Sequence, residues 1–234
     1  SGLVRSQVLL LARRGAKGTL VLLRCAERVD RTFPGWTRRA FGPDGAYRPY
    51  DHNLPAPQPR RPGGAQANED DSPETRTGAW VAEGLGQALR DRGLRPALIL
   101  CSPALRCVQT AAALCSRLPA DHPPIALEPG LFEPLGWYAN LPEHLGAKAL
   151  RSCGYPVSEQ YAPTLDGLPI HLLGREREGA AARRIVQSLQ AVLDSAAPQL
   201  SWDSDPLILV VGHAFTLDAV LRSSLPARVS QLCD

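Results

Sequence analysis

Two short stretches carry residues that together could bind and transfer a phosphoryl group. One apolar run ends in VLLRCAERVD (21–30), which contains Arg24, Cys25 and Arg28, and another ends in LILVVGHA, which contains His213. Arginines from different elements can fork onto one phosphate, and a histidine can donate to a phosphoryl oxygen as charge develops on it. A cysteine beside arginines is a candidate nucleophile, because positive charge favours its thiolate.

Arg106 and Glu133 complete this candidate set. Arg106 falls near the start of a predicted helix, and Glu133 follows a predicted strand. A carboxyl group near arginines can protonate a leaving oxygen. Taken singly, each residue has another interpretation: Arg28 as a surface ion-pair residue, Glu133 as a helix cap and His213 as a satisfied core histidine. Together they favour a phosphate pocket.

Four buried strands and three helices are expected to position these side chains. The strands are predicted at 19–24, at 97–102, in the first half of 125–133 and at 207–214. The helices are predicted at 77–92, 103–117 and 176–196. Three of the strands are continuous apolar runs, which is typical of strands covered on both faces. This alternation predicts an α/β fold with a mostly parallel sheet and helices on both faces, in which ligands bind beyond the carboxyl ends of the strands.

Capping residues and apolar spacing predict where the helices begin and which face of one helix is buried. Ser102 is expected to be the N-cap of the helix at 103–117, with Pro103 at its first position, and this role is favoured over phosphate binding. The segment TLDAVLRSSL predicts a further helix after His213. The apolar face of the helix at 77–92 is expected to contain Val81, Leu85, Ala88 and Leu89.

One domain is expected over residues 19–234, preceded by a linker or N-terminal extension at 1–18. Residues 42–76 are rich in Pro, Gly, Asn and Asp and predict a long surface excursion near the pocket. Residues 134–175 are irregular and predict a small helical cap or lid. Little sequence follows the last helix, so one edge of the sheet is expected to lack a partner strand.

Composition excludes some partners. The formal net charge is only +3, so nothing indicates nucleic acid, although 24 of the 26 basic residues are arginine. That bias suits phosphate contacts, but a GC-rich coding sequence produces it as well. No apolar run is long enough for membrane insertion. Six cysteines without C-x-x-C pairs indicate neither a zinc motif nor a disulfide framework, and favour a reducing, cytoplasmic location, with the nucleus as an alternative.

In this order the motifs resemble the histidine phosphatase superfamily, which has the phosphoglycerate-mutase-like fold. CSPALRCVQTA, EPGLFE and RVDRTFPGW are similar to the phosphatase domain of ubiquitin-associated, SH3-containing proteins that suppress T-cell receptor signalling, over residues 19–220. The resemblance implies a three-layer α/β fold and phosphomonoester hydrolysis through a phosphoenzyme, without metal or organic cofactor. It also implies phosphotyrosine-bearing proteins as partners, and a homodimer.

The same resemblance assigns roles to single residues. It implies phosphate binding by three arginines and one histidine, namely Arg24, Arg28, Arg106 and His213. It implies that Glu133 is the proton donor to the leaving group and that His213 also stabilises the phosphoryl group in the transition state. The remaining histidines, His52, His122, His144 and His171, receive no role.

Cys25 stands where the family has its nucleophilic histidine, and Ala26 stands where it has glycine. A sulfur atom lies closer to the backbone than an imidazole nitrogen, and a misplacement of about 1 Å can cost roughly 100-fold in rate. The sequence therefore predicts a weak or inactive phosphatase. One alternative is a non-catalytic pseudophosphatase that binds phosphate or phosphopeptides.

A second alternative is a cysteine-nucleophile phosphatase that uses Cys25. Residues 25–31, CAERVDR, satisfy the C-x5-R spacing of such enzymes, but Arg28 replaces the glycine expected in the middle of the loop. Glu27 is expected to bond local backbone groups and to have a structural role.

Overall fold

The computed structural model describes residues 10–15, 18–55, 59–138, 140, 144–165, 172, 174–196 and 206–223. The strands are β1 (Leu10–Gly15), β2 (Gly18–Arg24), β3 (Pro96–Cys101), β4 (Ile125–Leu127) and β5 (Leu207–Gly212). The α-helices are α1 (Val29–Thr32), α2 (Trp36–Ala40), α3 (Gly64–Asp70), α4 (Arg76–Asp91), α5 (Leu105–Cys115), α6 (Ala147–Ser152), α7 (Glu178–Ala196) and α8 (Ala214–Arg222). Two 3₁₀ turns, η1 (Pro129–Leu131) and η2 (Leu135–Trp137), follow β4.

The strands form one sheet in the order β1-β2-β5-β3-β4. Four strands run parallel to one another, namely β2, β5, β3 and β4. Strand β1 is antiparallel to its neighbour β2. Arg24 at the end of β2 pairs with Gly212, and Cys101 at the end of β3 pairs with Val211. The carboxyl ends of three adjacent strands therefore meet at one edge, as the sequence predicted.

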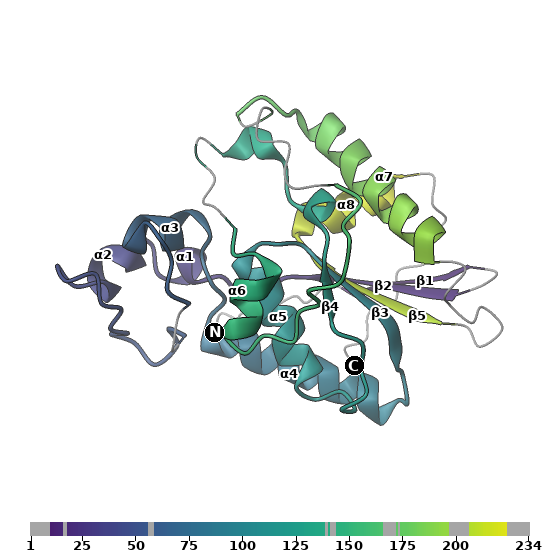
Figure 1. Ribbon diagram of the computed structural model, residues 1–234, viewed down its shortest axis with the longest axis horizontal. Helices are drawn as coiled ribbons and strands as arrows, with labels where there is room; N and C mark the ends of the chain where they lie inside the picture. The colour runs from purple at the N-terminus through teal and green to yellow at the C-terminus, as the bar shows by residue number, and fades with distance from the viewer. Residues whose placement is uncertain are drawn as a thin grey trace, which may run out of the picture.

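Helices cover both faces of the sheet, which confirms the three-layer α/β fold (Figure 1). Helices α4 and α5 lie on one face, and α7 and α8 lie on the other. Alternation along β2 sends Val21, Leu23 and Cys25 into the core under α4 and α5, and sends Leu20 and Leu22 into the core under α7 and α8. Cys25 is thus a continuation of the first core.

The buried face of α4 differs from the predicted one. Gly78, Ala82, Gly86 and Leu89 are buried, whereas Val81, Leu85 and Ala88 are only partly buried. A Cβ atom at Gly86 would lie 2.2 Å from the Leu114 carbonyl oxygen, so α4 approaches the backbone of α5 too closely for a side chain. Small residues, rather than the large apolar ones, therefore mark the contact face.

Strand β1 was not predicted. It pairs with β2 along its whole length, so the outer edge of β2 has a partner strand. Arg13 and Arg14 interrupt its apolar pattern, which explains why the sequence indicated only an extension. The rest of the segment 1–18 lies largely outside the described residues.

The excursion at 42–76 projects from the domain only in its first part. This first part contains α3 and lies against α1 and α2, which precede it, and all three helices extend away from the sheet (Figure 1). Together they enclose a small, mostly aromatic cluster around Trp36 and Leu54. Residues 71–75 return to the domain and are all buried, so the prediction of a surface excursion is wrong for them. These residues are held in the domain by polar contacts, because the Asp71 and Thr75 side chains accept hydrogen bonds from backbone N–H groups at the starts of α5 and α4.

The segment 144–158 packs beside β4 rather than only forming a lid. Val157 makes a parallel bridge with Ile125, and Leu150 of α6 joins the core under α4 and α5.

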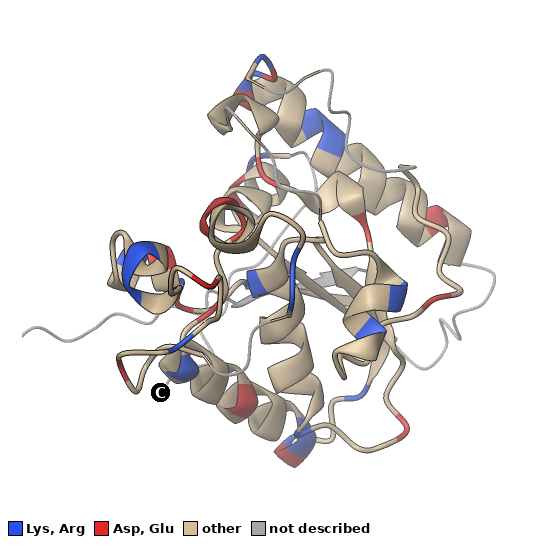
Figure 2. Cartoon of the chain, turned by 60° about the vertical axis from the view of Figure 1, so that its left-hand side comes forward, with Lys and Arg blue, Asp and Glu red and all other residues tan. Residues whose placement is uncertain are grey.

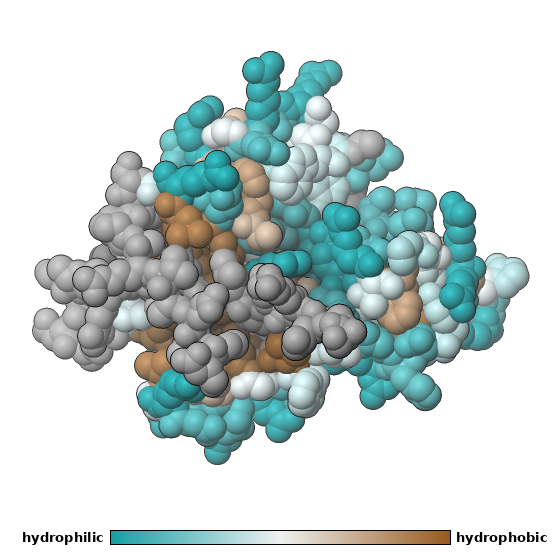
Figure 3. Space-filling model, turned by 180° about the vertical axis from the view of Figure 1, so that it is seen from behind, coloured by the Kyte–Doolittle hydropathy of each residue, from teal (hydrophilic) through white to brown (hydrophobic). Residues whose placement is uncertain are grey.

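Acidic and basic residues share the same helices and loops (Figure 2). Apolar side chains gather in patches on the face of the molecule opposite to the one in Figure 1 (Figure 3). None of the described helices has the length and apolar character needed to cross a membrane.

Candidate functional site

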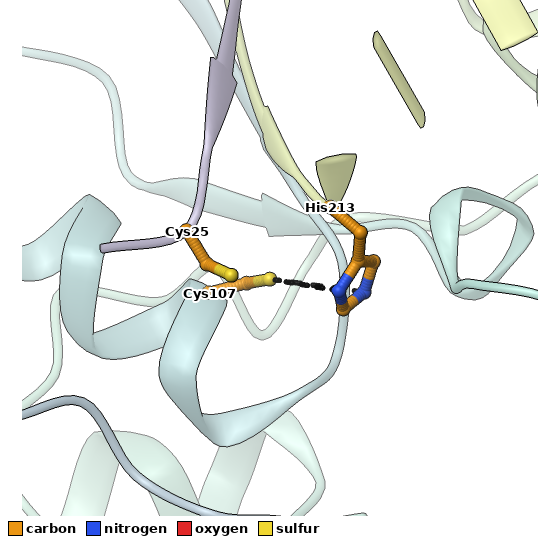
Figure 4. A group of neighbouring side chains, drawn as sticks. All are labelled: Cys25, Cys107 and His213. Carbon is orange, nitrogen blue, oxygen red and sulfur yellow. Dashed lines mark hydrogen bonds between the residues drawn. The ribbon is translucent and has the colours of Figure 1, made fainter. Parts of the chain in front are cut away.

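Cys25 lies directly after β2 at the carboxyl edge of the sheet. Its N–H donates to the Gly212 carbonyl at 2.8 Å, and the next N–H, of Ala26, donates to Thr110 Oγ1 at 3.0 Å. These two bonds extend the strand by one residue and tie it to α5. The side chain is only 4% exposed and points toward Cys107 and His213 (Figure 4).

His213 is held at the N-terminus of α8. Its N–H donates to Thr216 Oγ1, and Ser102 Oγ lies 2.8 Å from its Nε2 atom. Arg106 Nη2 lies 3.1 Å from Nδ1. Because a guanidinium group can only donate, this contact favours the ring form that carries its proton on Nε2, where Ser102 accepts it.

Ser102 is therefore a partner of His213, and the prediction that it caps a helix is wrong. Helix α5 has Ala104 at its N-cap, and the Leu105 N–H donates to the Asp71 carboxylate at 2.9 Å. A carboxylate from a distant segment thus replaces the expected local cap.

Arg106 is fully buried in the first turn of α5. Nη2 donates to Glu133 Oε1 in a short hydrogen bond, and Nη1 lies 3.6 Å from Asp71 Oδ1. Its Nε atom is buried and has no hydrogen-bond partner among the described residues. One donor of this guanidinium group therefore remains available at the site.

Glu133 accepts hydrogen bonds from Arg106 and from the Tyr138 hydroxyl. Arg28 Nη1 lies 3.9 Å from Oε1, and His213 Nδ1 lies 3.6 Å from Oε2. Burial alone would raise the pKa of Glu133, but His213, Arg106, the Tyr138 hydrogen bond and Arg28 lower it to about 2. Glu133 is therefore ionised at neutral pH and cannot donate a proton in this state.

The two predicted phosphate-binding arginines near Cys25, Arg24 and Arg28, differ in their surroundings. Arg28 makes a two-point contact with Asp30, at 2.9 and 2.8 Å, and faces Glu133. Arg24 lies one residue before Cys25, so strand alternation directs it to the opposite face of the sheet. No hydrogen bond or ion pair joins its side chain to another described residue. The structure thus brings Arg28 to the site and does not link Arg24 to it.

Cys25 and Cys107 behave as one titrating pair. A hydrogen bond from Cys107 lowers the pKa of Cys25, burial opposes this, and His213 and Arg106 lower it further. Burial and the charge on Cys25 raise the pKa of Cys107. Of the two thiols, Cys25 is therefore the one that ionises more easily, while Cys107 Sγ can donate to the Gly212 carbonyl oxygen at 3.4 Å.

The sequence analysis missed three residues that contact this group, namely Asp71, Cys107 and Tyr138, and it gave Ser102 the role of a helix cap. Asp71 is the most connected of them, since it also accepts from Arg61 Nη2 at 2.6 Å and lies 3.5 Å from His144. These residues come from separate segments and form no local motif. Adjacency to Arg106 was the only signal that could have singled out Cys107.

The residues that follow Cys25 have structural roles. Glu27 Oε1 accepts from Thr75 Oγ1 at 2.8 Å and from Asn53 Nδ2 at 3.2 Å, so its partners are side chains rather than the expected backbone groups. Ala26 faces Gly78, where an added Cβ would lie 3.1 Å from the alanine methyl group. The missing side chain at Gly78 thus leaves room for Ala26.

A cavity of about 550 Å³ lies away from this group, in the projecting segment. Phe41, Tyr47, Arg60 and Asn68 are among its lining residues. None of the candidate site residues lines it. Among the described residues, Cys25, Cys107 and His213 are a group that could hold a metal, with ligand atoms within 4.8 Å of one another.

Comparisons with known proteins agree with the observed fold. The family described as histidine phosphatase superfamily (branch 1) matches residues 60–233. The human ubiquitin-associated and SH3 domain-containing protein A is 32% identical over 90% of this chain, and the Drosophila melanogaster ecdysteroid-phosphate phosphatase is 32% identical over 87%. The chain spans only 31% and 26% of the lengths of these two proteins.

A solved structure extends the likeness to the segment before residue 60. The ecdysone phosphate phosphatase from Bombyx mori, in complex with tungstate, superposes with a TM-score of 0.74 at 29% identity. The superposition covers 91% of this chain and 81% of that one. Because Arg24, Cys25 and Arg28 precede the matched range 60–233, their place at the site rests on the fold rather than on the family match.

Proposed function

Because the chain belongs to the histidine phosphatase superfamily (branch 1), we propose that it is a phosphomonoester-binding domain in which hydrolysis through a phosphoenzyme is weak or lost. The observation that carries the proposal is the environment of Cys25. At the nucleophile position the chain has a buried side chain that faces Cys107 and the core instead of an imidazole.

Phosphate binding is supported by the groups that remain. Arg106 has a buried Nε donor without a described partner, and Arg28 Nη1 lies 3.9 Å from the same Glu133 oxygen that Arg106 contacts. A phosphate that competes with Glu133 for the Arg106 guanidinium gains a charge-assisted contact with a buried side chain. His213, fixed by Ser102, provides a further polar contact.

Weak turnover follows from charge and position. The pKa of Cys25 is lowered well below its usual value, which favours the thiolate, and a thiolate repels the phosphate dianion that it would have to attack. The Cys25 side chain also points toward Cys107 (Figure 4), and Cys25 belongs to the core under α4 and α5. Glu133 is ionised until a bound dianion raises its pKa, so the proton for the leaving group is missing in the resting state.

An aromatic pair beside the site supports a substrate with a large apolar group. Trp137 is 54% exposed and packs edge-on against Phe215, with ring centroids 5.3 Å apart. Trp137 precedes Tyr138, a partner of Glu133, and Phe215 follows His213 by two residues. Both an aryl phosphate, such as phosphotyrosine, and the steroid phosphates in the names of two relatives carry such a group.

Two alternatives stand beside this proposal. The first is a pseudophosphatase that binds a phosphorylated protein and restrains signalling without turnover, and the retained arginines support it. The second uses Cys25 as a nucleophile, but Arg31 of its C-x5-R spacing is exposed on α1. Under the same proposal the domain acts in the cytoplasm, with the nucleus as an alternative, and pairs with a second copy.

The test compares hydrolysis by the unaltered protein and by Cys25→His. The substrates are an aryl phosphate, a phosphotyrosine peptide and an ecdysteroid phosphate, and Cys153→His, at an exposed cysteine, is the matched control. We expect phosphate binding with little turnover by the unaltered protein and the control, and a gain of turnover in Cys25→His. Rapid turnover by the unaltered protein, lost in Cys25→Ser, would show that Cys25 is a working nucleophile and would overturn the proposal.

A further inference from the structure

We propose that Cys25, Cys107 and His213 form a binding site for a thiophilic divalent ion of the Zn²⁺ class. The three side chains come from the end of β2, from the first turn of α5 and from the N-terminus of α8. Figure 4 shows both sulfur atoms beside the imidazole ring, and their ligand atoms all lie within 4.8 Å of one another. All three residues are buried.

The spacing suits a four-coordinate ion. Cys107 Sγ lies 3.8 Å from His213 Nε2 and 3.9 Å from Nδ1. Zinc binds sulfur at about 2.3 Å and nitrogen at about 2.0–2.1 Å, so a tetrahedral site separates these two ligand atoms by about 3.6 Å. For this pair a shift of a few tenths of an ångström suffices, and Cys25 Sγ, one residue after β2, lies within 4.8 Å of both other ligand atoms.

Neighbouring groups favour Nε2 as the ligand atom. Ser102 Oγ, which lies 2.8 Å from Nε2, can rotate its hydroxyl and is placed to fill the fourth position. An ion at Nε2 moves the ring proton to Nδ1, which faces Glu133 Oε2 at 3.6 Å. A carboxylate that accepts from the second nitrogen is the usual support of a metal-binding histidine.

Charge and ligand chemistry define the kind of ion. When the ion binds, Cys107 releases its proton to solvent, and the two thiolates then balance the dication, so the occupied group is neutral. Arg106 loses its contact with Nδ1, but Glu133 and Asp71 still hold its guanidinium group. Sulfur and imidazole ligands select Zn²⁺ and related ions over Mg²⁺ and Ca²⁺, which prefer oxygen.

The test titrates the reduced, metal-free full chain with Co²⁺, whose visible absorption reports tetrahedral thiolate coordination, and then adds Zn²⁺ as competitor. We expect one equivalent of Co²⁺ to bind with a two-thiolate spectrum that Zn²⁺ abolishes and Mg²⁺ does not. Cys25→Ser and Cys107→Ser should each lower the affinity at least 100-fold. Cys115→Ser, a buried cysteine of the same helix outside the group, is the matched control and should bind normally.

A second variant keeps the test decisive if a serine substitution prevents folding. Cys25→His retains a ligand at the same position, so it should bind Co²⁺ with about half the thiolate charge-transfer intensity. Binding that survives Cys25→Ser and Cys107→Ser in folded protein would overturn the proposal. So would a Cys25→His spectrum identical to the unaltered one, or the absence of Co²⁺ binding by the reduced protein. These readouts are spectroscopic and do not depend on whether phosphate is hydrolysed.

Discussion

Arg106 and Glu133 neutralise each other at the centre of the candidate site. The guanidinium of Arg106 donates to a carboxylate whose pKa is held at about 2, and both side chains are buried. A phosphate that binds Arg106 must compete with this carboxylate. The ion pair therefore limits phosphate affinity in the resting state while it keeps the arginine in place.

Glu133→Gln should bind phosphate more tightly. The substitution removes the competing charge but keeps a side chain of similar shape beside Arg106, so we expect roughly a tenfold gain in affinity, about 1.4 kcal/mol. Isothermal titration with inorganic phosphate measures it. Glu83→Gln, which breaks an exposed ion pair with Arg117, is the control and should leave the affinity unchanged. Weaker binding by Glu133→Gln would show that the carboxylate itself helps to hold the ligand.

Cys25→Ser should also bind phosphate more tightly, for a different reason. It replaces a thiol whose pKa is lowered by a hydroxyl that stays neutral, so the repulsion between a thiolate and the dianion is removed. The gain should be largest at neutral to alkaline pH, where phosphate is a dianion. Cys101→Ser, at a buried cysteine whose thiol has its pKa raised by burial, serves as the control. An unchanged affinity in Cys25→Ser would mean that the thiolate does not face the bound anion.

The strand ends were predictable from the sequence, because continuous apolar runs locate parallel strands. Cys25 and His213 each follow such a run, so their meeting at one edge of the sheet follows from the α/β topology. Strand β1 was not predictable in the same way, because it lies at the edge of the sheet and needs no continuous apolar run. Its partner β2 provides the hydrogen bonds.

The groups that hold the site together could not be predicted from spacing. Asp71 reaches Arg106 from a segment whose composition indicated a surface loop, and its burial depends on Arg61 and on the N–H of Leu105. Ser102 had a convincing local role as a helix cap, but the tertiary contact with His213 replaced it. Local propensity decides such a residue only when no buried partner lies nearby.

Asp71→Asn should destabilise the fold strongly. Asp71 compensates two buried guanidinium groups, Arg61 and Arg106, and its pKa is held well below its usual range: burial opposes this, while His144 and these arginines lower it. Removing the charge from a buried pair costs roughly 3–5 kcal/mol. Urea unfolding measures the loss, and Asp121→Asn, in an exposed pair with Arg95, should change stability little. Equal effects of the two substitutions would contradict this role.

Glu74 should make the protein less stable as the pH rises through neutrality. Burial raises its pKa to about 8, although its hydrogen bond with Thr110 acts in the opposite direction. The Thr110 hydroxyl has one proton to donate, yet its Oγ1 atom lies 2.8 Å from Glu74 Oε2 and 2.7 Å from the Arg106 carbonyl oxygen. A protonated Glu74 resolves this conflict, because it can donate to Thr110 while Thr110 donates to the carbonyl.

The sign follows from the two pKa values. An unfolded glutamate titrates near pH 4.3, so between there and about pH 8 the folded state binds more protons than the unfolded state. The free energy of unfolding therefore falls by up to about 1.4 kcal/mol per pH unit across this window and levels off above it. Glu74→Gln should remove that fall and gain relative stability at pH 8, as measured by urea unfolding from pH 5 to 9. The contribution of Glu133 changes only below about pH 4.3, because its pKa is lowered, so Glu133→Gln should leave the slope between pH 5 and 8 intact. A slope that Glu74→Gln does not change would show that this carboxyl is already ionised at neutral pH.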